Sequence, residues 1–233
     1  MQADTQFSFS DNQQIAGTSL YSGTIFRHYS TPEVSTYQQN IYAFVFRCLD
    51  IALSFVAVIF LIFVIPFIWV ANRCFDSGPL YYNQKRVGKN GKAFIMYKLR
   101  SMVVNAEKNG IQFTTQNDER ITKVGLFLRK TRLDELPQAI NVLKGDMSFI
   151  GPRPERPEFV KILAEKDEEY TQRLLVKPGL TGWAQVKYKY TDNIEDALIK
   201  LRYDLYFLRN RNIKMDLEII ARTIWIVISK QGT

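Results

Sequence analysis

One uncharged apolar stretch constrains the fold of this chain more than any other feature. Residues 51–71 read IALSFVAVIFLIFVIPFIWVA and contain no Asp, Glu, Lys or Arg. About 18 or more consecutive apolar residues suffice for a helix that crosses the hydrocarbon core of a bilayer. The alternative is a helix buried in a soluble core, but such helices seldom reach this length without a charge. The stretch therefore predicts a membrane helix.

The residues in and around this stretch bear on its topology. Residues 85–100 contain four lysines and two arginines, which favours a cytoplasmic location for the segment after the helix. Pro66 removes one backbone hydrogen bond and clashes with the carbonyl of Ile62, so we expect a kink there. A kinked apolar helix either crosses the bilayer or dips into one leaflet and returns, and the residues alone favour crossing.

Length and charge narrow the classes of protein and partner. The 233 residues include 31 Lys and Arg against 23 Asp and Glu, which gives a formal net charge of +8. The length predicts one domain with an appendage, and the charge predicts an anionic partner such as a membrane surface or a phosphorylated substrate. No nucleic acid is expected among the partners, because the basic residues are dispersed and no nucleic-acid-binding motif is present. The only histidine, His28, argues against a histidine-ligated zinc site.

Flexible, strand-forming and helical segments are predicted outside the apolar stretch. Residues 1–40 are rich in Gln, Ser, Thr and Asn and predict a flexible polar lead without a signal peptide. Residues 81–87 and 93–99 are predicted strands, because the intervening GKNGK contains the Asn-Gly pair typical of a hairpin. Short helices are expected within residues 121–130, 155–175 and 195–208.

The C-terminal segment is apolar but too short and too charged to span a membrane. Residues 217–228 read LEIIARTIWIVI and carry Glu218 and Arg222. Trp and Ile side chains at this density suit a helix that lies on the bilayer surface. Packing into the protein core is an almost equal alternative.

Two adjacent carboxylates lie at the end of a basic stretch. Residues 129–138 read RKTRLDELPQ, in which Asp134 and Glu135 follow two arginines and a lysine. Pro137 suits the first turn of a helix, and the apolar spacing predicts that this helix stops at Gly145. Free N–H groups at a helix start favour anions, so the stretch predicts a pyrophosphate site with a metal on the carboxylates. An N-capping aspartate with solvated arginines is the alternative.

Two loops rich in Gly and Pro follow. Residues 151–154 (GPRP) hold Arg153 next to prolines that stiffen the loop, which suits bidentate recognition of a phosphate. A plain structural turn is the alternative for this loop. Residues 177–186 (KPGLTGWAQV) contain small residues that allow the backbone to approach a ligand closely.

From about Ile41 to the C-terminus, the chain resembles the bacterial sugar transferases, the monotopic phosphoglycosyl transferases of the polyprenyl-phosphate type. Five motifs carry the resemblance: YKLRSM at 97–102, LDELPQ at 133–138, NVLKGDMS at 141–148, GPRP at 151–154 and KPGLTGWAQ at 177–185. One of these motifs alone would be weak, whereas five in order and at family-like spacing are highly specific.

The resemblance implies an α+β fold in three parts. Residues 1–40 form the polar lead, residues 41–76 a re-entrant membrane helix, and residues 77–233 a small, mainly helical, membrane-associated catalytic domain with a short β-hairpin and interfacial amphipathic helices. The re-entrant helix of the family breaks at a proline, which Pro66 matches, so that both its ends are cytoplasmic. The implied location is the cytoplasmic face of the bacterial inner membrane, in contact with its lipids. Many members carry a larger N-terminal membrane region, so we expect this chain to resemble the minimal form.

The resemblance also implies a reaction. A UDP-sugar gives its sugar 1-phosphate to undecaprenyl phosphate, and the products are an undecaprenyl-diphosphate sugar and UMP. This reaction initiates the assembly of exopolysaccharide, capsule or O-antigen. It depends on Mg²⁺ and proceeds through a covalent aspartyl-phosphosugar intermediate.

The family's pattern assigns roles to individual residues. Asp134 is the implied nucleophile and Mg²⁺ ligand, and Glu135 assists the attack of the polyprenyl phosphate. The implied substrate-binding residues are Lys98, Arg129, Arg153, Thr181, Gln185 and Asp204. A second class stays open, a membrane-anchored basic scaffold without chemistry, although it explains neither the carboxylate pair nor the ordered loops. A homo-oligomer also stays open.

Overall fold

The computed structural model describes residues 36–108, 110, 118–188 and 193–229, and its longest element is the N-terminal helix. Helix α1 (Thr36–Phe75) has 40 residues, or about 60 Å of helix. It begins five residues before residue 41, the predicted start of the membrane helix. Residues 1–35 of the predicted polar lead lie outside the described residues. Residues 41–75 of α1 are long and apolar enough to cross a membrane, and only 17% of their most apolar window is buried in the protein.

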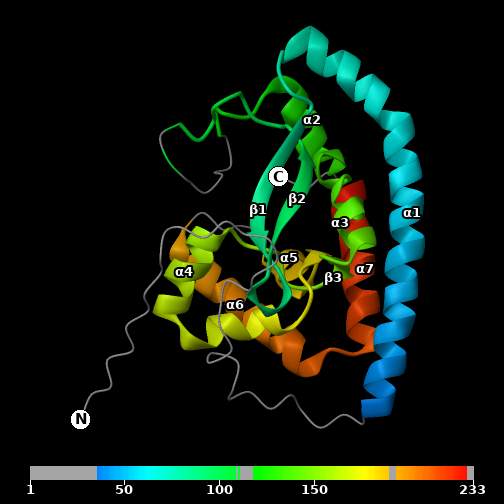
Figure 1. The fold of residues 1–233 in the computed structure, drawn as a ribbon, viewed down its shortest axis with the longest axis vertical. Helices are drawn as coiled ribbons and strands as arrows, with labels where there is room; N and C mark the ends of the chain where they lie inside the picture. Colours follow the sequence, from blue (N-terminus) through cyan, green and yellow to red (C-terminus); the bar gives the residue numbers. More distant parts are fainter. Residues whose placement is uncertain (1–35, 109, 111–117, 189–192, 230–233) are drawn as a thin grey trace.

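Helix α1 bends without breaking. Figure 1 shows α1 running along one side of the molecule and then bending across its top in the half that contains Pro66. The helix is continuous through this proline, so the chain is not interrupted there. The structure therefore has the bend that the proline predicts, whereas re-entry into one leaflet stays a prediction.

Polar side chains near the N-terminal end of α1 attach it to the rest of the chain. Arg47 donates hydrogen bonds of 2.6 and 2.9 Å to the last carbonyls of α3 (Gln138–Lys144). Asp50 is buried and accepts a hydrogen bond of 2.9 Å from the backbone N–H of Phe149.

The C-terminal end of α1 is attached in the same way. Asn72 accepts a hydrogen bond of 2.7 Å from Arg100, and the Asp76 carboxylate accepts one of 3.0 Å from the backbone N–H of Val124. Val124 lies in the first turn of α2 (Lys123–Lys130). Both ends of a long apolar helix are therefore bonded to one folded body.

The predicted hairpin is confirmed residue for residue. Strands β1 (Tyr81–Val87) and β2 (Ala93–Leu99) pair antiparallel, with Val87 opposite Ala93. The connection contains the short 3₁₀ turn η1 (Lys89–Gly91), in which Asn90 has a φ of 56°. Asn and Gly tolerate this left-handed conformation, which is why the Asn-Gly pair marks the turn.

The remaining elements are mostly helical, as the α+β prediction requires. After α2 come η2 (Leu133–Glu135), α3, β3 (Ser148–Ile150), α4 (Pro157–Lys166), η3 (Glu168–Leu175), β4 (Gly179–Thr181), α5 (Trp183–Lys187), α6 (Ile194–Asn210) and α7 (Ile213–Ile228). Strands β3 and β4 pair in parallel, which the sequence did not predict. The largest buried cluster joins α4, η3 and α6 through Val160, Leu163, Tyr170, Leu201 and Leu205.

Helix α7 packs into the core on one face, and its position on the bilayer surface stays a prediction. Met215 and Ile219 on one face are buried in the protein core, next to Ile150 and Phe207. The other face exposes large apolar side chains, among them Trp225, which is 66% exposed. One face therefore packs, and the other is free to contact a bilayer.

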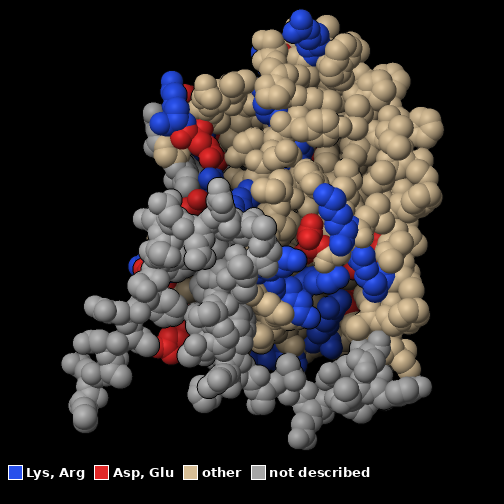
Figure 2. All heavy atoms as spheres, viewed as in Figure 1, with Lys and Arg blue, Asp and Glu red and all other residues tan. Residues whose placement is uncertain are grey.

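Basic side chains gather at the tip of the hairpin. Lys89 and Lys92 are exposed there. Figure 2 shows Lys and Arg concentrated at this end of the hairpin, whereas the surface along α1 carries few charged side chains. The exposed large apolar side chains of α1 and the basic side chains at the hairpin tip suit a protein at the surface of an anionic membrane.

Candidate active site

The two adjacent carboxylates lie on η2, directly before α3. The backbone reaches this 3₁₀ turn through Arg132, whose φ is 58°. The N-cap position of α3 is held by Pro137, and no side chain caps this helix. The alternative in which Asp134 is an N-cap is therefore wrong. Asp134 and Glu135 are instead both buried, with 7% and 8% of their surface exposed.

Glu135 is held by cations. Its carboxylate accepts a short hydrogen bond from Arg153, and Lys98 and Arg132 lie 3.7 and 4.0 Å away. Burial opposes ionisation of Glu135, but the charges of these cations outweigh it and hold its pKa well below the usual range. Glu135 is consequently a permanent anion at neutral pH.

Asp134 has the opposite environment. Its Oδ1 atom is buried and has no hydrogen-bond partner among the described residues. Burial, followed by the neighbouring charge of Glu135, raises the pKa of Asp134 to about 6. Two adjacent carboxylates with pKa values pushed apart are typical of catalytic pairs with different roles.

Arg153 is presented by a tightly packed pair of loops. The N–H of Gly151 donates to the carbonyl of Thr181, and the N–H of Gly179 donates to that of Pro152, both at 2.9 Å. A Cβ atom on Gly179 would lie 2.1 Å from the backbone nitrogen of Gly151, so the close approach requires glycine. The parallel pairing of β3 with β4 thus fixes the loop that carries Arg153.

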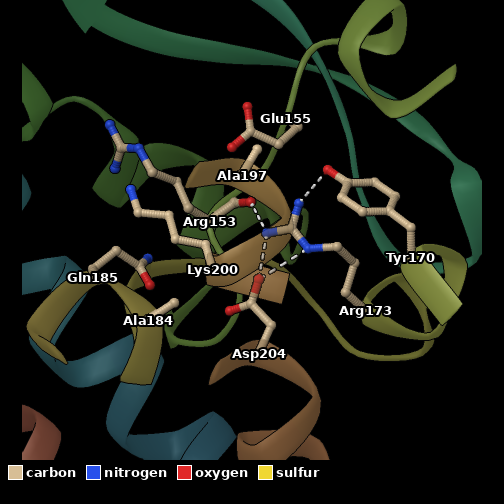
Figure 3. Close-up of a pocket in the computed structure, with 9 residues that line it drawn as sticks. All are labelled: Arg153, Glu155, Tyr170, Arg173, Ala184, Gln185, Ala197, Lys200 and Asp204. Atoms are coloured by element: carbon tan, nitrogen blue, oxygen red, sulfur yellow. Dashed lines mark hydrogen bonds and ion pairs between the residues drawn. The ribbon is translucent and has the colours of Figure 1, made fainter. Parts of the chain in front are cut away.

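A buried ion pair supports Arg153 from behind. Arg173 donates to Asp204 at 3.0 Å, to the hydroxyl of Tyr170 at 2.7 Å and to the carbonyl of Arg153 at 2.8 Å. Figure 3 shows these bonds converging on the Arg173 guanidinium. Asp204 was predicted to bind substrate, and the structure places it 3% exposed beneath Arg173. Its link to the site runs through Arg173 and Arg153, and contact with substrate stays a prediction.

The other predicted binding residues divide into two groups. Lys98, Arg129, Asp134 and Arg153 all line one cleft of about 500 Å³, which lies in the range of small-molecule sites. Within it, Arg129 donates from Nε to the hydroxyl of Ser101 at 2.9 Å.

Thr181 and Gln185 do not line this cleft. The Thr181 hydroxyl is hydrogen-bonded to that of Thr223 on α7 at 2.7 Å. Gln185 lines a cavity of about 20 Å³ behind Arg153, large enough for one water molecule. Both polar atoms of its amide are buried without a hydrogen-bond partner among the described residues.

A buried aspartate in a cleft lined by basic side chains, in a chain that also carries a long apolar helix, agrees with the sequence comparisons. The sequence model described as bacterial sugar transferase matches residues 41–230. The chain belongs to the bacterial sugar transferase family.

Three relatives illustrate the chemistry within the family. The UDP-N-acetylgalactosamine-undecaprenyl-phosphate N-acetylgalactosaminephosphotransferase of Aeromonas hydrophila is 41% identical over 192 residues, which cover 82% of this chain and 45% of the relative. The UDP-glucose:undecaprenyl-phosphate glucose-1-phosphate transferase of Escherichia coli K12 is 39% identical over 77% of this chain and 39% of the relative. The undecaprenyl-phosphate galactose phosphotransferase of Salmonella typhimurium is 36% identical over 81% of this chain and 41% of the relative. The chain spans less than half the length of each.

The site of this sugar transferase family member fits a metal that is shared with a substrate. The described residues contain no group of three or more His, Cys, Asp and Glu side chains that could hold an ion. The carboxylate of Asp134, one oxygen of which has no hydrogen-bond partner among the described residues, is available as one ligand. Mg²⁺ commonly binds through one or two carboxylates together with substrate phosphates, so a single carboxylate is sufficient.

Sequence reasoning missed three side chains that lie at or behind the candidate site of this family member: Arg173, Tyr170 and Lys200. Arg173 donates to the carbonyl of Arg153 and to the hydroxyl of Tyr170, and Lys200 lines both the cleft and the small cavity. A signal for Lys200 existed, because it lies four residues before Asp204 on α6 and so shares a helix face with it. Nothing in the sequence pairs Asp204 with Arg173, because 31 residues separate them.

Proposed function

We propose that this protein transfers a sugar 1-phosphate from a UDP-sugar to undecaprenyl phosphate, giving an undecaprenyl-diphosphate sugar and UMP. The names of the relatives support this donor and acceptor. The observation that carries the proposal is the buried oxygen of Asp134, which has no hydrogen-bond partner in the described part of the chain and belongs to a cleft lined by Lys98, Arg129 and Arg153. Such a carboxylate is poised to attack an anionic diphosphate that the cations neutralise.

In the first half-reaction, Asp134 acts as nucleophile. Its carboxylate oxygen attacks the phosphorus that bears the sugar, and the bond from this phosphorus to the bridging oxygen breaks. UMP leaves with the bridging oxygen, and the sugar phosphate stays on Asp134. Oδ1 has no hydrogen-bond partner among the described residues, which favours this role because no bond to them has to be broken before attack.

In the second half-reaction, an oxygen of undecaprenyl phosphate attacks the same phosphorus, which releases Asp134. A proton acceptor is not required, since a phosphate monoester with a second pKa near ~6 is mostly ionised at neutral pH. Glu135 is poorly suited to accept a proton because its pKa is lowered. It orients Arg153 and Lys98 toward the phosphates instead.

Mg²⁺ belongs to this proposal as the cofactor. When bound, it supplies positive charge to the diphosphate oxygens as negative charge develops on the leaving UMP. Asp134 would hold it together with oxygens of the substrate.

We further propose that α1 is re-entrant and that the catalytic domain rests on the cytoplasmic face of the inner membrane. The support is that Arg47 and Asp50 near one end of α1, and Asn72 and Asp76 near the other, bond to the same body. A helix that crossed the bilayer would put these ends on opposite sides. Nucleotide sugars are cytoplasmic, which fixes the side.

Cysteine labelling tests the topology. Cys48 and Cys74 are replaced by alanine, and Ser35→Cys or Lys92→Cys then supplies one thiol on either side of α1. An impermeant reagent should label both variants only after permeabilisation. Labelling of the Ser35→Cys protein in intact cells would mean that α1 crosses.

A substrate panel tests the reaction. The relatives' names cite N-acetylgalactosamine, glucose and galactose, so UDP forms of all three belong in the panel. The full chain is incubated with undecaprenyl phosphate, Mg²⁺ and each UDP-sugar, and UMP is measured. We expect acceptor-dependent UMP release with at least one donor. Release with none would favour the alternative, a membrane-anchored basic scaffold without chemistry.

A further inference from the structure

The cleft contains a cation that the reaction described above does not use. We propose that Lys200 of α6 binds a phosphate of a substrate beside Arg153. This inference rests on the proposed function, because that function supplies the phosphates. It adds a binding residue that neither the sequence motifs nor the relatives' names assign.

The position of Lys200 is the first observation. Its side chain lines the large cleft together with Lys98, Arg129 and Asp134, and it also lines the small cavity behind Arg153. Figure 3 shows the side chains of Lys200 and Arg153 extending in the same direction, away from the Arg173–Asp204 pair. The ammonium group is thus directed toward the cleft and not toward the nearest aspartate on its own helix.

The lack of a counter-ion is the second observation. Among the described residues, Lys200 forms no hydrogen bond and no ion pair within 4.0 Å. The carboxylates around it are already taken, because Glu155 pairs with Arg86 at 3.3 Å and Asp204 with Arg173 at 2.8 Å. Burial, and then the charge of Arg153, lower the pKa of Lys200. A partly buried ammonium beside another cation is unfavourable, and a bound anion removes that cost.

Phosphate is the anion that the proposed substrates bring to the cleft. A UDP-sugar brings two phosphates, one for Asp134 and one that leaves within UMP, and undecaprenyl phosphate brings a third. The charge of Asp134 acts to raise the pKa of Arg129, so these two side chains lie near each other. The charges that act on the pKa of Lys200 belong to a different set of groups: Arg153, Glu155, Asp204 and Arg173. This arrangement suits a second phosphate, and the nucleotide phosphate is the one we expect.

Three variants test the inference in the full chain, reconstituted in lipid nanodiscs. Lys200→Met removes the ammonium and keeps the length of the side chain. Lys200→Arg keeps a cation. Lys166→Met is the matched control, because Lys166 is exposed at the end of α4 and does not line the cleft. The measurements are kcat, the KM for UDP-sugar, the KM for undecaprenyl phosphate, and the binding of UMP by calorimetry without turnover.

We expect Lys200→Met to raise the KM for UDP-sugar and to weaken UMP binding by the same factor. That factor should be roughly ten- to a hundredfold, the range for one charge-assisted hydrogen bond. The change in kcat should be much smaller, Lys200→Arg should recover most of the loss, and Lys166→Met should match the wild type. A rise confined to the KM for undecaprenyl phosphate would also support the proposal, with the polyprenyl phosphate as the ligand.

Two results would overturn it. Unchanged KM values and unchanged UMP binding in Lys200→Met would mean that the ammonium binds no phosphate. A loss of kcat and of thermal stability that Lys200→Arg does not recover would mean a structural role. Failure of the proposed function looks different, because the wild type itself would then release no UMP with any donor.

Discussion

Replacing Asp134 and Glu135 one at a time by their amides should change the pH dependence of stability in opposite directions. Asp134 has a pKa raised from 3.8 to about 6 by burial and by its neighbour, whereas the cations around Glu135 hold its pKa below 4.5. The two substitutions are chemically the same and lie at adjacent, equally buried positions. Each is therefore the matched control for the other.

The magnitude follows from proton linkage. Between pH 3.8 and about 6, folded protein keeps a proton on Asp134 that unfolded protein releases, so wild-type stability falls as the pH rises through this window. From pH 4 to pH 7 the loss amounts to about 2 kcal/mol. The Asp134→Asn protein lacks this loss and should gain about 2 kcal/mol relative to the wild type over that range.

The contribution of Glu135 to stability changes with pH in the opposite direction. Its contribution to stability is fully present above the unfolded pKa and is lost as the pH falls toward the lowered folded value. The Glu135→Gln protein should therefore lose about 1 kcal/mol relative to the wild type between pH 4 and pH 7. It should also be less stable at pH 7 by about 3–5 kcal/mol, because Arg153 and Lys98 lose their buried counter-ion.

Urea unfolding in detergent without Mg²⁺, followed by the fluorescence of the three tryptophans, measures these differences. The change with pH is the informative quantity, because a packing cost of the amide itself does not titrate. If Asp134→Asn differs from the wild type by the same amount at pH 4 and pH 7, the carboxylate has no raised pKa. The environment described for Asp134, buried and with an oxygen that no described residue hydrogen-bonds, would then be wrong.

Three further predictions concern activity, measured as UMP release. Asp134→Asn should lower turnover by several orders of magnitude, because an amide does not attack phosphorus, and near-normal activity would refute its role. Arg153→Lys keeps the charge but loses the planar fork on Glu135, so kcat/KM should fall roughly ten- to a hundredfold. An unchanged kcat/KM would mean that Arg153 supplies only a positive charge. The kcat/KM should rise with pH through about 6 as Asp134 ionises and fall through about 8 as Lys98 loses its proton. A profile that is flat between pH 5 and pH 9 would contradict both assignments.

The sequence was most informative where structure depends on neighbouring residues. The hairpin matches its prediction at all four strand ends because the Asn-Gly turn sets the register locally. The helix after Pro137 ends as predicted because Gly145 adopts a left-handed φ of 87°. Lys98, Arg129, Asp134 and Arg153 line one cleft, and the roles that the resemblance implied for them stay predictions.

The sequence was least informative where structure depends on distant partners. Strands β3 and β4 have three residues each and pair in parallel across the intervening α4 and η3, so no local pattern marks them. Whether Asp204 faces the cleft or Arg173 depends on how η3 packs on α6. The proline at position 66 predicts a weakened helix, but the packing of both ends of α1 decides how far the helix bends.

The central claim is that Asp134 carries the sugar phosphate covalently, and intact mass spectrometry tests it most directly. The full chain is mixed with Mg²⁺ and an accepted UDP-sugar in the absence of undecaprenyl phosphate, quenched in acid and weighed. The account predicts an added mass of one sugar phosphate, located on Asp134 after digestion, absent from Asp134→Asn and removed by adding undecaprenyl phosphate. The account would be contradicted if the same preparation releases UMP once undecaprenyl phosphate is added but shows no added mass on any residue in its absence.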